Sequence, residues 1–171
     1  MTKQDRKIRY LTYTGILAAM ITLMTAYVCH IPIGTSGGYI HFGDALIYVG
    51  AAVLPKPYAI AAAVIGGGLA DLLTAPMWAP ATMIIKMLIV LPFTSKKINF
   101  LNMQNVIALF IGAMITCVGY FFAEYLLFGT WAVFFASIFP NLIQGLGSAI
   151  FFIIISGALE KTKFKQRILN K

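Results

Sequence analysis

Four ionisable residues interrupt stretches of the sequence that are otherwise apolar. They are Asp44, Asp71, Lys86 and Glu124. A charged side chain in hydrocarbon is costly unless it is paired or reaches water, so each of them marks a candidate site for a small polar solute. The sequence has no GxxxxGK[ST] phosphate loop, no HExxH and no Gly-x-Ser-x-Gly elbow. We therefore expect binding rather than catalysis, with no catalytic residue, no cofactor and no metal.

Each of these residues also has a purely structural interpretation. Asp44 follows Gly43 at the start of a predicted helix and could cap it. Lys86 could be the counter-ion of Asp71 or Glu124, and Glu124 could instead reach water at the membrane surface. Asp71 is harder to explain in this way, because a carboxylate near the C-terminus of a helix opposes the helix dipole.

Further polar and aromatic residues are expected beside these charges. An aromatic belt at the outer membrane interface is the ordinary explanation, and stacking on a flat heterocycle is the alternative, for Tyr39, Trp78, Tyr125 and Trp131. His41 is more typical of interfacial packing than of ligand contact, although it lies in the loop beside Asp44. The candidate substrate-binding residues are Tyr39, His41, Asp44, Asp71, Trp78, Lys86, Glu124, Tyr125, Asn141 and Gln144.

The composition is that of a membrane protein. Of the 171 residues 60% are hydrophobic and 11% are charged, whereas a soluble domain carries about 25% charge. The net charge of +8 arises at the ends of apolar runs, where basic residues orient membrane helices, so we expect no nucleic-acid partner. Cys29 and Cys117 lie inside apolar stretches and indicate neither a disulfide nor a metal site.

Six apolar segments are expected to cross the lipid bilayer, at about 20 residues per helix. Pro55 and Pro57 end the second segment, because a helix interior does not tolerate two prolines. The stretch 131–159 would form a helix of roughly 43 Å, too long for one span. We therefore expect 131–139 to be an interfacial segment and Pro140 to open the last helix. The predicted spans are 11–31, 44–54, 58–73, 80–93, 105–128 and 140–159.

The basic residues predict the orientation of these helices. All of the 13 lysines and arginines except Lys86 fall at the termini or in the two loops on the same side as the termini. The positive-inside rule places that side in the cytoplasm. We predict an all-α membrane protein, a single domain over 1–171 that forms a compact bundle of six transmembrane helices with both termini cytoplasmic. The polar residues then form a cup in the outer half, without an exit through the apolar inner half.

Small residues four positions apart let membrane helices approach each other closely. In the segment 58–73 such residues are expected to pack inside the bundle. The first helix carries two adjoining faces of this kind and a basic end, so one face is expected to contact another membrane protein. The predicted partner-interface residues are Gly15, Ala18, Ala19, Thr22 and Ala26.

The chain resembles the substrate-binding S components of energy-coupling factor (ECF) vitamin transporters. The resemblance rests on the six predicted spans, the face Ala18-xxx-Thr22-xxx-Ala26, and GYIHFGDA from Gly38 to Ala45. This last segment is similar to the Gly-x-Ile-His-x-Gly-Asp pattern of the branch related to riboflavin S components, whereas Thr22 replaces one of three alanines usual in the family. The resemblance implies a multi-pass subunit of the bacterial cytoplasmic membrane without its own ATPase. It also implies docking through the first helix on a transmembrane coupling (T) subunit driven by two ABC ATPase subunits, and toppling to release the vitamin.

The charges of the candidate site narrow the choice of vitamin. Three carboxylates and one lysine favour a neutral or weakly basic ring over an anionic vitamin. Within its branch the chain most resembles hydroxymethylpyrimidine S components, with the pyridoxine-type group next. A standalone transporter or channel would need polar residues through the full membrane thickness. A membrane enzyme would need an acidic metal cluster or a nucleophile with its base, and the sequence shows neither.

Overall fold

The computed structural model describes residues 2–28, 30–33, 38–129 and 131–169, and within these ranges only the backbone at 33, 38–40, 131–137 and 168–169. The chain is 83% helical, which confirms the all-α class. Its elements in chain order are α1 (Lys3–Ala26), β1 (Ile31–Ile33), β2 (Gly38–Ile40), α2 (Gly43–Val53), α3 (Lys56–Thr74), the 3-10 helix η1 (Pro76–Trp78), α4 (Ala79–Val90), α5 (Met103–Phe128), α6 (Trp131–Lys161) and α7 (Phe164–Leu169).

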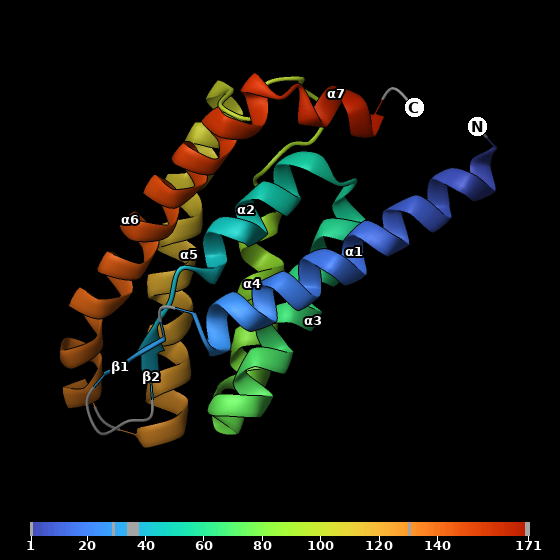
Figure 1. Cartoon of the computed structure of the whole chain (residues 1–171). Helices are drawn as coiled ribbons and strands as arrows, with labels where there is room; N and C mark the ends of the chain where they lie inside the picture. Colours follow the sequence, from blue (N-terminus) through green and yellow to red (C-terminus); the bar gives the residue numbers. More distant parts are fainter. Residues whose placement is uncertain (1, 29, 34–37, 130, 170–171) are drawn as a thin grey trace.

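Four helices of the described chain are long and apolar enough to cross a membrane. They are α1, α3, α5 and the part Ile138–Lys161 of α6, while α2 and the run Pro76–Val90 are apolar but shorter. At 1.5 Å per residue α2 extends about 16 Å, half of a hydrocarbon core. It begins near the middle of the bundle (Figure 1), and the hairpin of β1 and β2 lies before it. Asp44, the second residue of α2, therefore lies inside the bundle and not at its edge.

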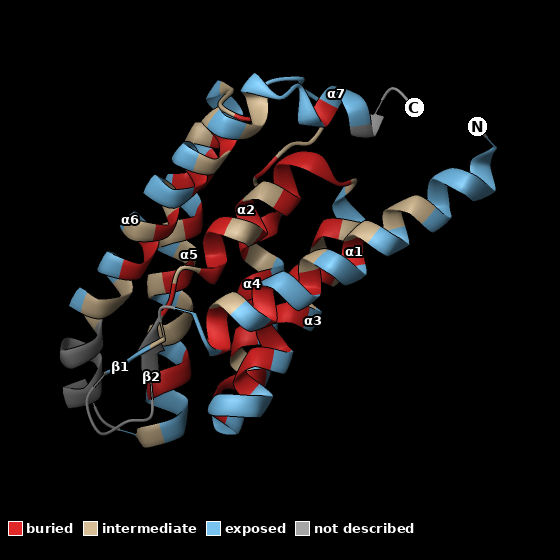
Figure 2. Cartoon of the chain, in the orientation of Figure 1, coloured by how far each residue is buried: buried red, intermediate tan, exposed pale blue. Residues whose placement is uncertain are grey.

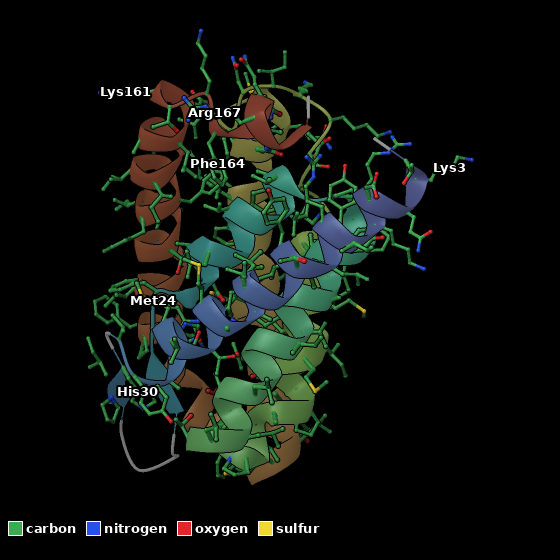
Figure 3. All side chains as sticks on the ribbon, turned by 45° about the vertical axis from the view of Figure 1, so that its right-hand side comes forward. Lys3, Met24, His30, Lys161, Phe164 and Arg167 are labelled. Atoms are coloured by element: carbon green, nitrogen blue, oxygen red, sulfur yellow. The ribbon has the colours of Figure 1, made fainter. Side chains whose placement is uncertain are left out.

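Both ends of the chain lie at the same end of the bundle, which we call the termini end (Figure 1). The antiparallel hairpin of β1 and β2, which the sequence pattern did not predict, lies toward the opposite end. Figure 3 shows Lys3, Lys161 and Arg167 at the termini end and His30 near the hairpin. This segregation of basic side chains is the one that the positive-inside rule describes for a cytoplasmic face.

The core forms around α2. Helix α1 packs mainly on α3, α3 on α4, and α5 on α6, while α2 contacts α1, α3, α4 and α6. Figure 2 shows buried residues along most of α2 and on the inner faces of α3 and α4, with an exposed outer face on α1. The ring of Tyr48 stacks on Phe93 at 5.0 Å between centroids and meets Phe152 edge-on at 6.1 Å. These aromatic contacts fix α2 against the α4–α5 loop and α6.

Helix α1 and helix α3 approach each other closely through small residues. A Cβ added to Gly66 would lie 2.8 Å from the carbonyl oxygen of Ala18. The Thr22 hydroxyl lies 3.0 Å from the carbonyl oxygen of Gly66 and donates to Ala18 as well. Ala18, Thr22 and Ala26 are thus buried within the chain, while Gly15 and Ala19 are exposed. Of the five predicted partner-interface residues on α1, two therefore lie on the exposed surface, Gly15 and Ala19.

The predicted bounds of α1 and α6 are wrong. Helix α1 begins at Lys3 because Thr2 and Asp5 form a capping box, and it ends at Ala26, before the strand β1. Helix α6 runs without a break from Trp131 to Lys161 and contains Pro140, so 131–139 is not a separate segment. Membrane helices tolerate an internal proline because neighbouring groups satisfy the freed carbonyl, and a long helix can tilt.

Candidate substrate site

A buried ion pair joins the start of α2 to the middle of α4. The ammonium of Lys86 lies 2.6 Å from Oδ1 of Asp44, and the two side chains are 1% and 0% exposed. Asp44 is not the cap of α2, because the N-cap residue is Phe42 and Asp44 is the second residue of the helix. The ion pair that the structure shows for Lys86 is thus with Asp44 and not with Asp71 or Glu124, the counter-ions that the sequence suggests.

Glycines give these two side chains room to meet. A Cβ on Gly67 of α3 would lie 2.9 Å from Cγ of Lys86, so the lysine stem passes directly over this glycine. A Cβ on Gly43 would lie 2.0 Å from Oγ1 of Thr25, so only glycine lets the start of α2 approach the end of α1. The prediction that the small residues of α3 pack inside the bundle is confirmed.

Gln144 and His41 extend the ion pair into a polar network. The amide of Gln144 on α6 donates to Oδ2 of Asp44 at 3.4 Å, and the backbone N–H of His41 donates to Oε1 of Gln144 at 3.3 Å. The N–H of Gly43 donates to Nδ1 of His41 at 3.1 Å, so this nitrogen is the unprotonated one. His41 and Gln144 are 4% and 3% exposed. The network orients both oxygens of the Asp44 carboxylate.

An aromatic group borders the ion pair on its α4–α5 side. The Lys86 ammonium lies 5.6 Å from the ring centroid of Tyr120, a cation–π distance. The Tyr120 hydroxyl hydrogen-bonds with the Thr82 hydroxyl at 2.9 Å, and Trp78 meets the Tyr120 ring edge-on at 6.1 Å. Trp78 is only 5% exposed, so it is not part of an interfacial aromatic belt. The sequence pattern does not single out Tyr120, although this residue precedes Glu124 by one helical turn.

The remaining candidates divide into buried and exposed residues. Asp71 and Glu124 are buried at the hairpin ends of α3 and α5, and the Asp71 carboxylate interacts electrostatically with Lys86. Tyr125 is 41% exposed, so its ring points away from the core. Asn141 is half-buried on α6, one turn before Gln144 of the site. Tyr39 lies on β2, and its side chain falls outside the described residues.

The sequence as a whole matches a known family. The family model described as "ECF-type riboflavin transporter, S component" matches residues 5–161, which span α1 to α6. The chain belongs to this family. A relative from Pyrococcus woesei is named "Uncharacterized protein in gap 3'region". It is 30% identical to this chain over 139 residues, which cover 80% of this chain and 89% of the relative.

Membership establishes the general role of the chain. An S component is the substrate-binding subunit of an ECF importer, a transport subunit rather than an enzyme. The family and the four apolar helices together indicate a membrane protein. In this S component the buried polar network centred on Asp44 and Lys86 is the candidate substrate site.

Proposed function

We propose that this S component binds a small, neutral or weakly basic vitamin or vitamin precursor at the Asp44–Lys86 network. The observation that carries the proposal is the buried ion pair, because charges inside a membrane bundle are rare and commonly belong to a solute site. Asp44, Asp71 and Glu124 supply three carboxylates against the single ammonium of Lys86, and all four are buried. This balance disfavours an anionic vitamin.

Hydroxymethylpyrimidine is the favoured ligand, with pyridoxine as the alternative of similar chemistry. The amino group of the pyrimidine can donate to a carboxylate of the site, and its ring nitrogens can accept from Lys86 or Gln144. The rings of Trp78 and Tyr120 offer a flat heterocycle an aromatic neighbour. These contacts would hold a small ring through both its edge and its face.

Riboflavin is a second candidate, and it rests on one observation. The family model that matches the chain carries the name of riboflavin transport. Riboflavin is also a flat, neutral heterocycle, so the charge balance of the site admits it. It is larger than hydroxymethylpyrimidine, and it carries a polyhydroxyl chain that the smaller ligand lacks.

Delivery to the cytoplasm is proposed to follow docking on a T subunit driven by two ABC ATPase subunits. The exposed small residues Gly15 and Ala19 of α1 would meet that subunit. Beside them an apolar groove of about 250 Å³ lies between α1, α2 and α6, with Ile16 and Met20 on its α1 side. The proposed setting is the cell membrane, with six spans and the termini end in the cytoplasm.

Thermal unfolding of the purified protein with single compounds tests the ligand. A ligand that binds only the folded state stabilises it by about 2.7 kcal/mol at 100 times its dissociation constant. We expect hydroxymethylpyrimidine or pyridoxine to raise the unfolding temperature, and biotin and folate, which are anionic, to leave it unchanged. A shift with riboflavin alone would favour the second candidate. A shift with biotin or folate alone would contradict the charge argument.

A further inference from the structure

Three buried hydroxyl groups lie one helical turn closer to the termini end than three residues of the candidate site. In each pair the site residue and the hydroxyl residue are four positions apart on one helix, so they share a helix face. The pairs are Asp44 and Tyr48 on α2, Gln144 and Ser148 on α6, and Tyr120 and Thr116 on α5. Figure 1 shows that α5 runs in the opposite direction to α2 and α6, which explains why Thr116 precedes Tyr120.

These hydroxyls are buried without a hydrogen bond. Tyr48, Thr116 and Ser148 are each 0% exposed, and their oxygen atoms find no hydrogen-bond partner in the part of the chain that the structure describes. A buried hydroxyl that makes no hydrogen bond costs about 1 to 3 kcal/mol. Three such groups, each on a residue one helical turn from a residue of the candidate site, therefore call for a function.

Other threonines of the chain show that such a cost is avoidable. A helical threonine commonly donates to the carbonyl oxygen four residues earlier. Thr14, Thr22 and Thr74 do so at 2.7, 2.9 and 2.8 Å. Thr116 and Ser148 are also helical but do not make this bond. Their hydroxyl groups therefore keep an unused donor and acceptor.

The position of Tyr48 connects these hydroxyls with the site. Its ring is fixed in the core by Phe93, and its hydroxyl oxygen lies 3.3 Å from the place where a Cβ of Gly112 would stand. Thr116 lies one turn beyond Gly112 on the same face of α5. The Tyr48 hydroxyl therefore faces α5 at Gly112, and Thr116 follows on the same face of α5, one turn nearer to Tyr120 of the candidate site.

We propose that the hydroxyls of Tyr48, Thr116 and Ser148 form the inner wall of the substrate site and hydrogen-bond to a hydroxyl group of the bound substrate. The inference rests on the proposed function of this site. A hydroxyl both donates and accepts, so the wall matches a substrate group that does the same, such as a hydroxymethyl. A site that hydrogen-bonds a substrate hydroxyl rejects an analogue without it, because the wall is then left unpaired.

The test compares nearly isosteric variants of the full-length purified protein. The wall variants are Tyr48→Phe, Thr116→Val and Ser148→Ala. The matched control is Ser156→Ala, because Ser156 is a second fully buried serine on α6 whose hydroxyl has no partner in the described chain, two turns further from the site. Each variant is measured for its unfolding temperature without ligand, and for its affinity for hydroxymethylpyrimidine and for the analogue that carries methyl in place of hydroxymethyl.

We expect the wall variants to unfold at the wild-type temperature or above, because each loses an unpaired buried hydroxyl. Their affinity for hydroxymethylpyrimidine should fall about tenfold per hydroxyl that contacts the ligand, close to 1.4 kcal/mol. Their preference for hydroxymethylpyrimidine over the methyl analogue should disappear. Ser156→Ala should keep the wild-type affinity and preference.

Two results would overturn the proposal that these hydroxyls form the inner wall of the substrate site. Wall variants that keep both affinity and preference would show that the hydroxyls do not contact the ligand. Wall variants that unfold at clearly lower temperatures without ligand would show that the hydroxyls serve the fold. If the wild type binds none of hydroxymethylpyrimidine, pyridoxine and riboflavin, the proposed function fails instead. The unfolding temperatures then decide, since values at or above that of the wild type in all three variants support an unpaired wall and a fall in them overturns it.

Discussion

The ammonium of Lys86 lies 2.6 Å from Oδ1 of Asp44, and neither side chain is more than 1% exposed. The pair connects α2 with α4, and Gln144 adds α6 to the same network. Breaking a buried ion pair by removing one partner leaves an uncompensated charge, whereas removing both partners does not. Single and double substitutions can therefore separate the contribution of the pair to the stability of the fold from its contribution to substrate binding.

Replacing either member of the pair alone should destabilise the protein strongly. We expect Asp44→Asn and Lys86→Met each to lower the free energy of unfolding by about 3 to 5 kcal/mol. The double variant should be much more stable than the sum of the single effects, because it buries no unpaired charge. Thermal or denaturant unfolding of the four purified proteins gives the comparison. Additive losses would mean that the two charges are not coupled.

Gly66 should not tolerate a methyl group. The Cβ of Gly66→Ala would lie 2.8 Å from the backbone oxygen of Ala18, so α1 must move away from α3. Overpacking of this kind costs about 1 to 3 kcal/mol. The matched control is Gly15→Ala, because no atom lies within 4 Å of a Cβ at Gly15. Equal unfolding temperatures for the two variants would show that the α1–α3 contact is not close.

The exposed face of α1 should matter for assembly and not for the fold. Ala19 is exposed, so Ala19→Trp should leave the unfolding temperature near that of the wild type. It should reduce co-purification with the T subunit at least tenfold, because a bulky side chain keeps helices apart at a small-residue contact. Met114→Trp serves as the control, since Met114 is 67% exposed on α5. Normal assembly of Ala19→Trp would place the docking surface elsewhere.

A second polar cluster holds the loop after α4 at the termini end. The Glu160 carboxylate accepts the backbone N–H of Phe100 at 2.6 Å. The Lys165 ammonium donates to the carbonyl oxygen of Lys97 and lies 5.6 Å from the Phe100 ring centroid. Burial lowers the pKa of Lys165 from 10.5 to about 8, and the negative charge of Glu160 opposes this shift.

Stability should therefore depend on pH through Lys165. Between about pH 8 and 10.5 the unfolded chain retains a proton on this lysine that the folded chain has lost. The free energy of unfolding thus rises with pH across this window, as far as Lys165 is concerned. Lys165→Met should remove that part of the rise, while Lys163→Met, on an exposed neighbour, should keep it. Identical pH profiles for the wild type and Lys165→Met would contradict the assignment.

The sequence predicts which residues are charged inside the bundle but not how they pair. Asp44 and Lys86 stand out because each interrupts an apolar run. Their contact depends on the closeness of α3 and α4 at Gly67, which no local pattern encodes. The sequence does not distinguish Tyr120, because an isolated tyrosine in an apolar helix resembles ordinary core, although its spacing from Glu124 places both residues on one helix face.

The helix boundaries show the same limit. The sequence predicts that Pro140 begins a helix, because proline is favoured in the first helical turn, where its missing N–H would have no partner within the helix. In the structure α6 continues through this residue. The small face of α1 was also ambiguous, because internal packing and partner contact require the same residue types. Only the burial of Ala18 and Thr22 against α3 shows which side of α1 is free.

Calorimetric titration of the solitary purified protein with hydroxymethylpyrimidine tests the central claim most directly. The comparison is between the wild type and the double variant Asp44→Asn with Lys86→Met, which is expected to stay folded. We predict binding of one molecule per chain without any partner subunit, and at least a hundredfold weaker binding by the double variant, about 2.7 kcal/mol. Equal affinities for the two proteins would contradict a substrate site at Asp44 and Lys86. An absence of binding to the folded wild type would contradict hydroxymethylpyrimidine as the substrate.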